Sequence, residues 1–345
     1  MNVALIGTRR GGVHARWLAA CPEFPVVAVA CAGDVAAARA LVMEHHPRAR
    51  ITTDALSLVR QGGIDMVVVA SPTDAHYGVV DEALRRGLLV VCETPLAPDV
   101  SAARKLADLA ASTPGQGVVP FQWRESPALR WARASLAEAE TGELLTVTID
   151  LHDDSHVGPR TPWPWRQQLR TAGGGALADL GVHAFDLLPW LTGLDLWEVT
   201  SSWTHRTLDL RSAAAGPVGV DVDDVAQAEL RPFGSPARAR VMVSRITPGR
   251  RQLRLTALGT RGRLEVTVNA GDGSGVMTLD TGARSRQKLF DPHPMNPYRR
   301  LADDLTVRSS ASSVASFDDG LAALHLVEVV LAGSRTESLL GPADQ

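Results

Sequence analysis

The chain has 345 residues, of which 45% are hydrophobic and 21% charged, and its formal net charge is −3. This length suits one large or two medium domains with substantial cores. The 35 basic and 38 acidic residues form no block of like charge, which argues against a nucleic-acid surface or a polybasic membrane anchor. No apolar run in the sequence reaches the roughly 18–20 residues that cross a bilayer.

The cysteines and histidines give no sign of a metal site. Cys21, Cys31 and Cys92 lack metal-ligand spacing, and an odd number of cysteines suits a reducing compartment. We therefore expect a cytoplasmic protein with buried thiols and no metal. His14 and Arg16 also interrupt any signal-peptide core before Cys21. The segment 152–156 carries two histidines and two aspartates but no further ligand with matching spacing, so we expect a polar loop there.

The first third of the chain alternates apolar strands with helices. We expect strands at 2–6, 25–31, 64–70, 88–92 and 117–122, and helices at 12–20, 34–46, 75–86 and 100–111. Nearly continuous Val, Ile and Leu runs between helices are typical of a parallel sheet covered on both faces. The sequence therefore predicts an α/β fold that begins with a Rossmann-like, doubly wound domain over residues 1–123.

The pattern changes after residue 123. We expect strands at 144–152, 197–205, 222–230, 238–246, 252–258 and 263–268, and helices at 176–191, 297–307 and 317–332. Arg238 and Arg240 alternate with Ala239 and Val241, which is typical of an antiparallel sheet with one half-exposed face. Residues 124–345 are therefore predicted to form an α+β domain with an open-faced, mostly antiparallel sheet.

The turn after the first strand reads Gly7-Thr8-Arg9-Arg10-Gly11-Gly12. In a dinucleotide-binding turn Gly7 would allow the tight bend and Gly12 the close packing of helix on strand, but Arg9 stands where the middle glycine lets pyrophosphate approach. The helix N-terminus still offers amides and a positive dipole end to an anion. Two readings remain open: a nucleotide-binding turn and a purely structural turn.

The end of the second strand bears on the choice of coenzyme. An acidic residue there binds the ribose hydroxyls of NAD, but the position is Cys31, and Asp34 comes later. Without an acid at Cys31 a 2′-phosphate is repelled less, and Arg9 or Arg10 could pair with it. The sequence therefore favours NADP(H) over NAD(H), with loss of the cofactor as the alternative.

Later motifs add a more specific signal. The segments Ala70-Ser71-Pro72-Thr73-Asp74-Ala75-His76 and Cys92-Glu93-Thr94-Pro95 follow two successive strands. Further on come Trp165-Arg166, Gly173-Gly174-Gly175, Asp179-Leu180-Gly181-Val182-His183-Ala184-Phe185-Asp186 and Tyr298. This order resembles the Gfo/Idh/MocA oxidoreductase family, over nearly the whole chain.

The resemblance implies hydride transfer at a carbinol or carbonyl carbon, often of a sugar or cyclitol. Typical members carry Glu-Lys-Pro where this chain has Glu93-Thr94-Pro95, and their lysine assists proton transfer. A threonine hydroxyl donates a hydrogen bond but does not titrate near neutral pH. Neither of the two lysines, Lys105 and Lys288, obviously replaces it.

The resemblance also assigns site residues. Cofactor contacts are implied for Gly7, Thr8, Arg9, Arg10, Gly12, Cys31, Ser71, Pro72, His76, Glu93, Thr94, Trp165 and Arg166. Substrate contacts are implied for Arg124, Trp163, Asp179, His183 and Tyr298. Several keep an alternative: a domain-interface salt bridge for Arg124, and packing for His76, Trp163 and Tyr298.

Asp179, His183 and Asp186 stand at i, i+4 and i+7, so one helix face would carry all three. His183 has the natural acid/base chemistry, which a carboxylate such as Asp179 can orient, and we assign catalysis to His183, Asp179 and Thr94. We expect the three glycines 173–175 to let the chain enter this helix close to another backbone.

Three functions stay open. The first is an NAD(P)-dependent oxidoreductase of a sugar, cyclitol or similar small metabolite. The second is a lyase, an isomerase or a cofactor-free protein that uses the same cleft, which the replacements at positions 9, 31 and 94 favour. The third is an imine reductase, whose branch resembles this family and also lacks the lysine. The family resemblance implies a homodimer or homotetramer through the C-terminal sheet.

Overall fold

The computed structural model describes residues 1–157, 168–207, 210–213, 216–282, 284–307, 314–333 and 335–337. The chain divides into two compact units. The first comprises Met1–Phe121 with Asn296–Leu324, and the second comprises Gln122–Met295 with the chain from His325 onward. Among the helices of these residues, none combines the length and apolar character that a bilayer span requires.

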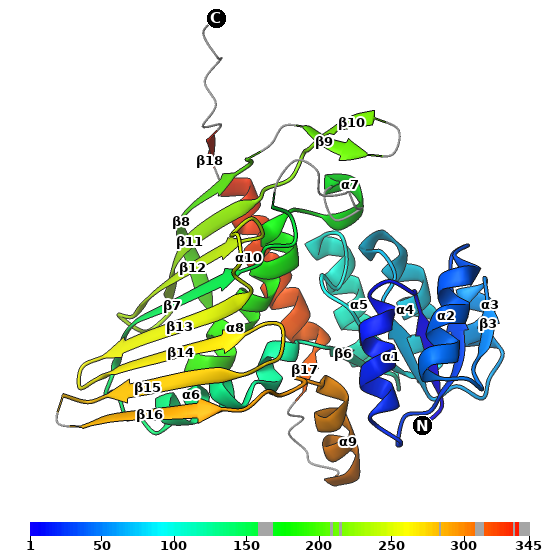
Figure 1. Cartoon of the computed structure of the whole chain (residues 1–345), viewed down its shortest axis with the longest axis horizontal. Helices are drawn as coiled ribbons and strands as arrows, with labels where there is room; N and C mark the ends of the chain where they lie inside the picture. The colour runs from blue at the N-terminus through cyan, green and yellow to red at the C-terminus, as the bar shows by residue number, and fades with distance from the viewer. Residues whose placement is uncertain are drawn as a thin grey trace, which may run out of the picture. The chain divides into compact units, whose positions relative to one another are not determined.

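The first unit is built on a twisted sheet with the strand order β17-β6-β5-β4-β1-β2-β3 (Figure 1). All neighbouring strands are parallel except β17, which pairs antiparallel with β6. The strands are β1 (Val3–Ile6), β2 (Val26–Ala30), β3 (Arg50–Thr52), β4 (Met66–Val69), β5 (Leu89–Cys92), β6 (Gln116–Val119) and β17 (Ala315–Ser316). The strand order reverses between β1 and β4, where doubly wound folds bind their ligands, so the predicted Rossmann-type fold is confirmed.

Helices connect these strands. They are α1 (Gly11–Ala19), α2 (Val35–His45), α3 (Ala55–Arg60), the 3₁₀ turn η1 (Thr73–Ala75), α4 (His76–Arg85), α5 (Val100–Ser112) and α9 (Pro297–Val307). Aspartates at positions 34, 54 and 99 cap α2, α3 and α5 by accepting a hydrogen bond from a backbone amide three residues later. Such caps satisfy amides that a helix start leaves without an intrahelical partner. Strand β3 and helix α3 were not predicted, because β3 has only three residues and none of them is fully buried.

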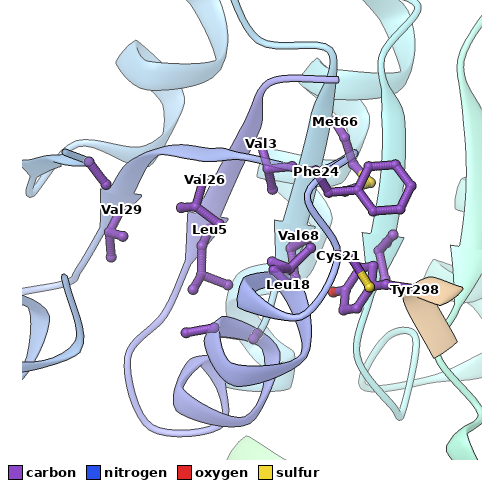
Figure 2. Packing of buried hydrophobic residues seen from close by; sticks show 14 of the residues in the cluster. Val3, Leu5, Leu18, Cys21, Phe24, Val26, Val29, Met66, Val68 and Tyr298 are labelled. Atoms are coloured by element: carbon purple, nitrogen blue, oxygen red, sulfur yellow. The ribbon is translucent and has the colours of Figure 1, made fainter. Parts of the chain in front are cut away.

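The central strands β1, β4 and β5 are buried along their whole length, as expected for a sheet covered on both faces. Figure 2 shows part of the core beside them, in which Leu18, Cys21, Phe24 and Tyr298 lie together. Cys21, Cys31 and Cys92 are all free and buried. Burying one large apolar side chain, such as leucine or phenylalanine, contributes about 1.5–3 kcal/mol. This core therefore accounts for a large share of the stability of the unit.

One segment departs from the predicted division at residue 123. Asn296–Leu324 belongs to the first unit, although it lies far along the chain. The Asn296 side chain donates a hydrogen bond to the Trp17 carbonyl (2.9 Å), and the Phe317 ring packs against Gly117, where a Cβ would come within 2.5 Å of it. The sequence pattern predicts α9 but does not show which sheet the helix covers.

The second unit contains a large sheet with the order β16-β15-β14-β13-β7-β12-β11-β8-β18 and a hairpin of β9 and β10 (Figure 1). The strands are β7 (Leu144–His152), β8 (Trp197–His205), β9 (Leu210–Ala213), β10 (Gly216–Gly219), β11 (Val225–Pro232), β12 (Arg238–Ser244), β13 (Gln252–Gly259), β14 (Arg263–Asn269), β15 (Gly275–Asp280), β16 (Ser285–Phe290) and β18 (Arg335–Glu337). Only β7–β12 and β8–β18 pair in parallel among these strands, so the mostly antiparallel sheet is confirmed.

Strand β16 was not predicted because its residues are exposed and polar. Five of its six residues are exposed, as suits an edge strand that charged side chains protect from pairing further. Helices cover one face of the large sheet. The residues of β11, β12 and β13 that point to this face alternate along each strand and are buried. These helices include α6 (Pro127–Ala137), which follows the 3₁₀ turn η2 (Gln122–Glu125), and α8 (Val182–Thr192). The short α7 (Leu169–Ala172) and the longer α10 (Phe317–Gly333) complete the described helices, and α10 crosses the boundary between the units.

The helix expected at 176–191 has two parts. Leu177–Gly181 forms a π-helical turn (η4), and α8 continues from Val182 to Thr192 with Pro189 inside it. In a π turn the hydrogen bonds join residues five apart. The predicted helix is therefore present, and only the π turn at its start was missed, because the periodicity of apolar residues does not reveal such a local change.

Candidate active site

The turn between β1 and α1 lies at the carboxyl edge of the parallel sheet. Gly7 has a φ of +100°, which favours glycine, and a Cβ at this position would overlap with the Ala70 carbonyl oxygen and lie 2.8 Å from the Ser71 nitrogen. The turn therefore packs directly against the end of β4. Only a residue without a side chain permits this approach, which is the geometry expected of the first glycine in a nucleotide-binding turn.

Neither Gly11 nor Gly12 is required by a close approach of the helix to the strand. Gly11 begins α1 and is buried, and a Cβ there would lie 3.7 Å from the Leu5 side chain. A Cβ at Gly12 would meet no atom within 4 Å. Gly12 therefore does not determine the packing of the helix on the strand. Arg9 of the same turn is exposed.

The residues at this edge fit a dinucleotide. The amino end of α1 follows the turn, and the buried hydroxyl oxygens of Ser71 and Thr73 have no hydrogen-bond partner within the described part of the chain. Pro72 lies between them, directly before η1. A helix N-terminus suits a phosphate, and buried hydroxyls without partners are expected to bind a ligand or water. Thr73 was not among the predicted site residues, although its position between Ser71 and His76 could have suggested it.

The end of β2 carries no carboxylate. Cys31 is buried, and its thiol lies 3.7 Å from the Thr52 carbonyl oxygen. Asp34, the later acid, is exposed and caps α2 by accepting a hydrogen bond from the Ala37 amide (3.0 Å). Cys31 therefore packs in the core of the unit.

His76 is 1% exposed and joins two loops. Its Nε2 lies 3.0 Å from the Ser71 carbonyl oxygen, and its Nδ1 lies 3.2 Å from the Leu96 carbonyl oxygen and 3.3 Å from Cys92 Sγ. Burial lowers the pKa of His76, so the neutral ring donates from one nitrogen only. Either nitrogen can carry that proton, since each faces a backbone carbonyl oxygen. This position corresponds to the packing alternative, since both ring nitrogens face atoms of the protein.

Glu93 and Thr94 follow β5 and are both buried. The Glu93 carboxylate accepts hydrogen bonds from Arg10 Nε (2.7 Å), from His14 Nε2 (2.8 Å) and from the Thr94 amide (3.0 Å). Tyr298 is 1% exposed, and its hydroxyl lies 2.6 Å from His14 Nδ1. The structure thus brings the predicted residues Arg10, Glu93, Thr94 and Tyr298 together within the first unit, around His14, which was not predicted.

In the second unit, the helix that carries Asp179 and His183 starts at a close backbone contact. The Asp223 carboxylate accepts hydrogen bonds from the amides of Gly175 and Leu177, both at 2.8 Å. A Cβ at Gly175 would overlap with the Asp223 carbonyl oxygen and lie 2.7 Å from its nitrogen. The expectation for this glycine segment is therefore confirmed at Gly175. Asp179 lies in the π turn, partly exposed, and His183 lies in the first turn of α8 with 6% of its surface exposed.

Asp186 differs from Asp179 and His183 because its carboxylate is held in a buried ion pair. It is 2% exposed and forms a two-pronged ion pair with Arg124, from Nε to Oδ2 (2.9 Å) and from Nη2 to Oδ1 (2.5 Å). Arg124 thus forms a salt bridge, as its alternative expected, but the partner belongs to the same second unit. The pair fixes η2 to α8 and so supports the helix that carries His183.

Sequence reasoning missed one charged cluster. Asp223, Asp224 and Arg245 are buried together, and Arg245 Nε lies 3.6 Å from Asp224 Oδ1 with both side chains fully buried. Burial raises the pKa of Asp223, although Arg245 and the two helix amides act in the opposite direction. Arg245 could have revealed this cluster. It directly follows β12 and falls on the same face as Ala239 and Val241, and a charge on a covered face requires a partner.

The remaining candidates are three residues near position 165 and the two histidines of the segment 152–156. Trp163, Trp165 and Arg166 lie outside the described residues. His152 contacts the Thr247 hydroxyl (3.1 Å) and His156 the Ser155 hydroxyl (2.7 Å). Within the described ranges, no group of three or more His, Cys, Asp or Glu side chains is arranged to hold a metal ion.

Comparisons with known proteins agree with both units. Residues 1–120 match the model of an oxidoreductase family with an NAD-binding Rossmann fold, and residues 129–265 match that of the GFO/IDH/MocA C-terminal domain. A levoglucosan dehydrogenase of Pseudarthrobacter phenanthrenivorans is 29% identical over 319 residues, which is 86% of this chain and 82% of that protein. An inositol 2-dehydrogenase of Rhizobium meliloti is 26% identical over 343 residues, or 96% of each chain.

A solved structure of a levoglucosan dehydrogenase in complex with NADH and L-sorbose has a TM-score of 0.86 over 97% of this chain and 96% of that chain, at 22% identity, which supports the fold. The two family models together match most of the chain, and both are models of one family. This chain therefore belongs to the Gfo/Idh/MocA family of oxidoreductases, with an NAD-binding Rossmann domain at its start.

Proposed function

We propose that this oxidoreductase transfers a hydride between NADP(H) or NAD(H) and a sugar, a cyclitol or a related small polar metabolite. The observation that carries the proposal is the turn at Gly7, which packs against Ser71 where the strand order reverses and therefore fits a dinucleotide. The substrate class is supported by the relatives, which are dehydrogenases of levoglucosan and inositol.

The proposal assigns proton transfer to His183. The nicotinamide, when bound, accepts or donates the hydride. The His183 imidazole takes the proton of the substrate hydroxyl during oxidation and returns it during reduction, because it can change protonation state near neutral pH. The Asp179 carboxylate, four residues earlier, orients the ring. Thr94 stands where typical members of the family carry the lysine, and its hydroxyl holds the substrate by a hydrogen bond without titrating. Lys105 and Lys288 are both exposed, on α5 and β16, and the proposal gives neither a role.

The proposal favours NADP(H) as the coenzyme. Cys31 gives the end of β2 no carboxylate that would bind ribose hydroxyls or repel a 2′-phosphate. Arg9 is exposed beside the turn, whereas Arg10 already pairs with the buried Glu93. We therefore assign the phosphate contact to Arg9.

The experiment that tests the coenzyme is a titration of the purified protein with NADPH and NADH, followed by tryptophan quenching and by calorimetry. We expect submillimolar binding, tighter for NADPH, and weaker NADPH binding in Arg9→Ala. If neither nucleotide binds, the redox function is wrong, and a redox-neutral enzyme or a cofactor-free protein takes its place. Turnover of cyclic imines but not of polyols would instead favour an imine reductase.

The catalytic assignment has its own test. His183→Ala should lower the rate of hydride transfer about 10²–10⁴-fold if His183 is the acid/base, with little change in nucleotide affinity. His325→Ala is a matched control, because His325 is an exposed histidine on α10, and its rate should stay within about twofold. A loss below tenfold in His183→Ala would remove His183 from this role.

We also propose that the protein forms a homodimer or homotetramer through the face of the large sheet opposite α6 and α8. Trp203, Gln227 and Met242 face one another across neighbouring strands there, and Trp203 is 36% exposed. Sedimentation velocity of the parent and of Trp203→Arg tests this assignment. A monomeric parent, or a variant with unchanged assembly, would contradict it.

A further inference from the structure

Glu93 lies at the centre of a chain of buried polar side chains in the first unit. One of its carboxylate oxygens, Oε1, accepts from both Arg10 Nε (2.7 Å) and His14 Nε2 (2.8 Å), while Oε2 accepts from the Thr94 amide (3.0 Å). Arg10 belongs to the turn that follows β1, whereas Thr94 follows β5. The carboxylate therefore connects two loops at the nucleotide-binding edge of the sheet.

His14 and Tyr298 complete the chain from the interior. His14 is fully buried on α1, and its ring packs edge-on against Trp17 and Tyr298, with centroids 5.5 and 5.8 Å apart. Tyr298 lies in the first turn of α9, and its backbone amide donates to Asn296 Oδ1 (3.0 Å). Figure 2 shows Tyr298 beside Cys21 and Phe24, within the core. A hydroxyl in this position cannot reach a substrate.

The charges fix the direction of the hydrogen bonds. Burial and the Glu93 carboxylate hold the pKa of Tyr298 well above its usual range, so its hydroxyl keeps its proton and donates to His14 Nδ1. The proton of a neutral His14 ring then lies on Nε2, which donates to Glu93. Burial would raise the pKa of Glu93, but Arg10 and His14 hold it well below its usual range. Among the described residues, Cys92 and His76 are further titratable groups that interact with Glu93.

We propose that His14 and Tyr298 are positioning residues that hold Glu93 in place, so that the turn carrying Arg10 and the segment carrying Thr94 are coupled and open together. We call Arg10, His14, Glu93 and Tyr298 the Glu93 tether. This inference rests on the proposed function for its significance, because Thr94 would hold the substrate and the turn would hold the nucleotide. It removes Tyr298 from the predicted substrate contacts and Arg10 from the predicted phosphate contacts.

Two substitutions of His14 form a matched pair. In His14→Gln the side-chain amide can take the place of Nε2 and still donate to Glu93, but it loses the contact with Tyr298. In His14→Asn the shorter side chain reaches only the place of Nδ1, so it keeps Tyr298 and loses Glu93. Both variants put an uncharged amide into the same buried position, so a general loss of packing affects them alike.

The first measurement is amide hydrogen exchange by NMR on the nucleotide-free protein. In His14→Asn the amides of Thr94, Gly12 and Val13 should all exchange about tenfold faster, because a hydrogen bond to a charged group is lost. In His14→Gln they should stay within about twofold of the parent. Tyr298→Phe conserves the packing and removes only the hydroxyl, so it keeps the donor to Glu93 as His14→Gln does and should accelerate the same amides no more than that variant. Equal effects of Asn and Gln, or unchanged Thr94 exchange in His14→Asn, would overturn the proposal.

The second measurement is the pH dependence of nucleotide affinity. The ligand is NADH, because its diphosphate does not titrate between about pH 5 and 8, unlike the 2′-phosphate of NADPH with its second pKa of about 6. Since Glu93 must be ionised to hold Arg10, the affinity of the parent for NADH should not change across this range. In His14→Asn the Glu93 carboxyl loses one stabilising donor, so the acid limb of NADH binding should begin at a higher pH than in the parent, whereas in His14→Gln it should not move. An acid limb at the same pH in both variants would contradict the coupling. If the parent binds neither nucleotide, the proposed function fails. The hydrogen-exchange measurements, which need no nucleotide, then test the Glu93 tether by themselves.

Discussion

The two units of this protein each bury a carboxylate beside candidate site residues, and they satisfy it in different ways. Glu93 in the first unit is held mainly by side chains, those of Arg10 and His14. Asp223 in the second unit is held by backbone, through the amides of Gly175 and Leu177. Side-chain donors can be replaced by others of similar reach, whereas a backbone contact depends on how closely two chain segments approach. The second site should therefore tolerate substitution much less than the first.

The electrostatic balance differs as well. The pKa of Glu93 lies well below its usual range because Arg10 and His14 outweigh burial, while burial raises the pKa of Asp223 despite the nearby Arg245. Two buried carboxylates of similar exposure thus respond to pH in opposite directions. The difference follows from the distance and geometry of the nearest cation, since Arg10 Nε hydrogen-bonds Glu93 at 2.7 Å.

Among the substitutions that test this comparison, Gly175→Ala should lower the free energy of unfolding most. The added methyl group would overlap with the Asp223 backbone, which cannot move without shifting β11, so we expect a loss of about 5 kcal/mol or a failure to fold. Gly78→Ala in α4 is the control, because a Cβ there meets no atom within 4 Å, and it should gain about 0.5–1 kcal/mol. Urea denaturation measures both. A Gly175→Ala variant as stable as the parent would show that the backbone contact is not rigid.

Asp186→Ala should have the next largest effect. It leaves Arg124 buried at 7% exposure without its carboxylate partner, which should cost about 3 kcal/mol in the free energy of unfolding. Asp81→Ala removes the partner of Arg85 on the surface of α4, and its unfolding curve should match that of the parent. If both variants unfold like the parent, the Arg124–Asp186 pair does not support the helix that carries His183.

Much of this fold was predictable, because the strands that form the cores are apolar along their length. The strands at 144–152 and 197–205 were predicted to the residue as β7 and β8, and the pattern of β4 and β5 is nearly continuous valine and leucine. Short or polar elements such as β3 and β16 escaped, since neither offers an apolar period to detect. The position of Asn296–Leu324 in the first unit depends on tertiary contacts that spacing does not express.

The candidate site was predictable where a local conformation demands one residue type. Gly7 and Gly175 occupy positions that a side chain cannot enter, and their motifs identified them. The role of His14 could not be read from the sequence, because its partners Glu93 and Tyr298 are distant along the chain and a buried histidine resembles any other core residue. The π turn was equally hidden, and it changes how Asp179 is presented relative to His183.

The smallest effect concerns pH and separates the two carboxylates by sign. The depressed pKa of Glu93 stabilises the fold above the unfolded value of about 4.3, and this stability is lost as the pH falls. The raised pKa of Asp223 destabilises the fold as the pH rises above about 3.9. As the pH falls from about 6 to 3.5, the stability advantage of the parent over Glu93→Gln should therefore shrink by about 1 kcal/mol, because only protonation of the unfolded chain below about pH 4.3 falls inside this range. Its advantage over Asp223→Asn should grow, by about 1.4 kcal/mol per unit of pKa shift. Urea titrations of the three proteins across this range measure both differences. If the two differences change in the same direction, the contrast between side-chain and backbone partners does not explain the electrostatics of the two sites.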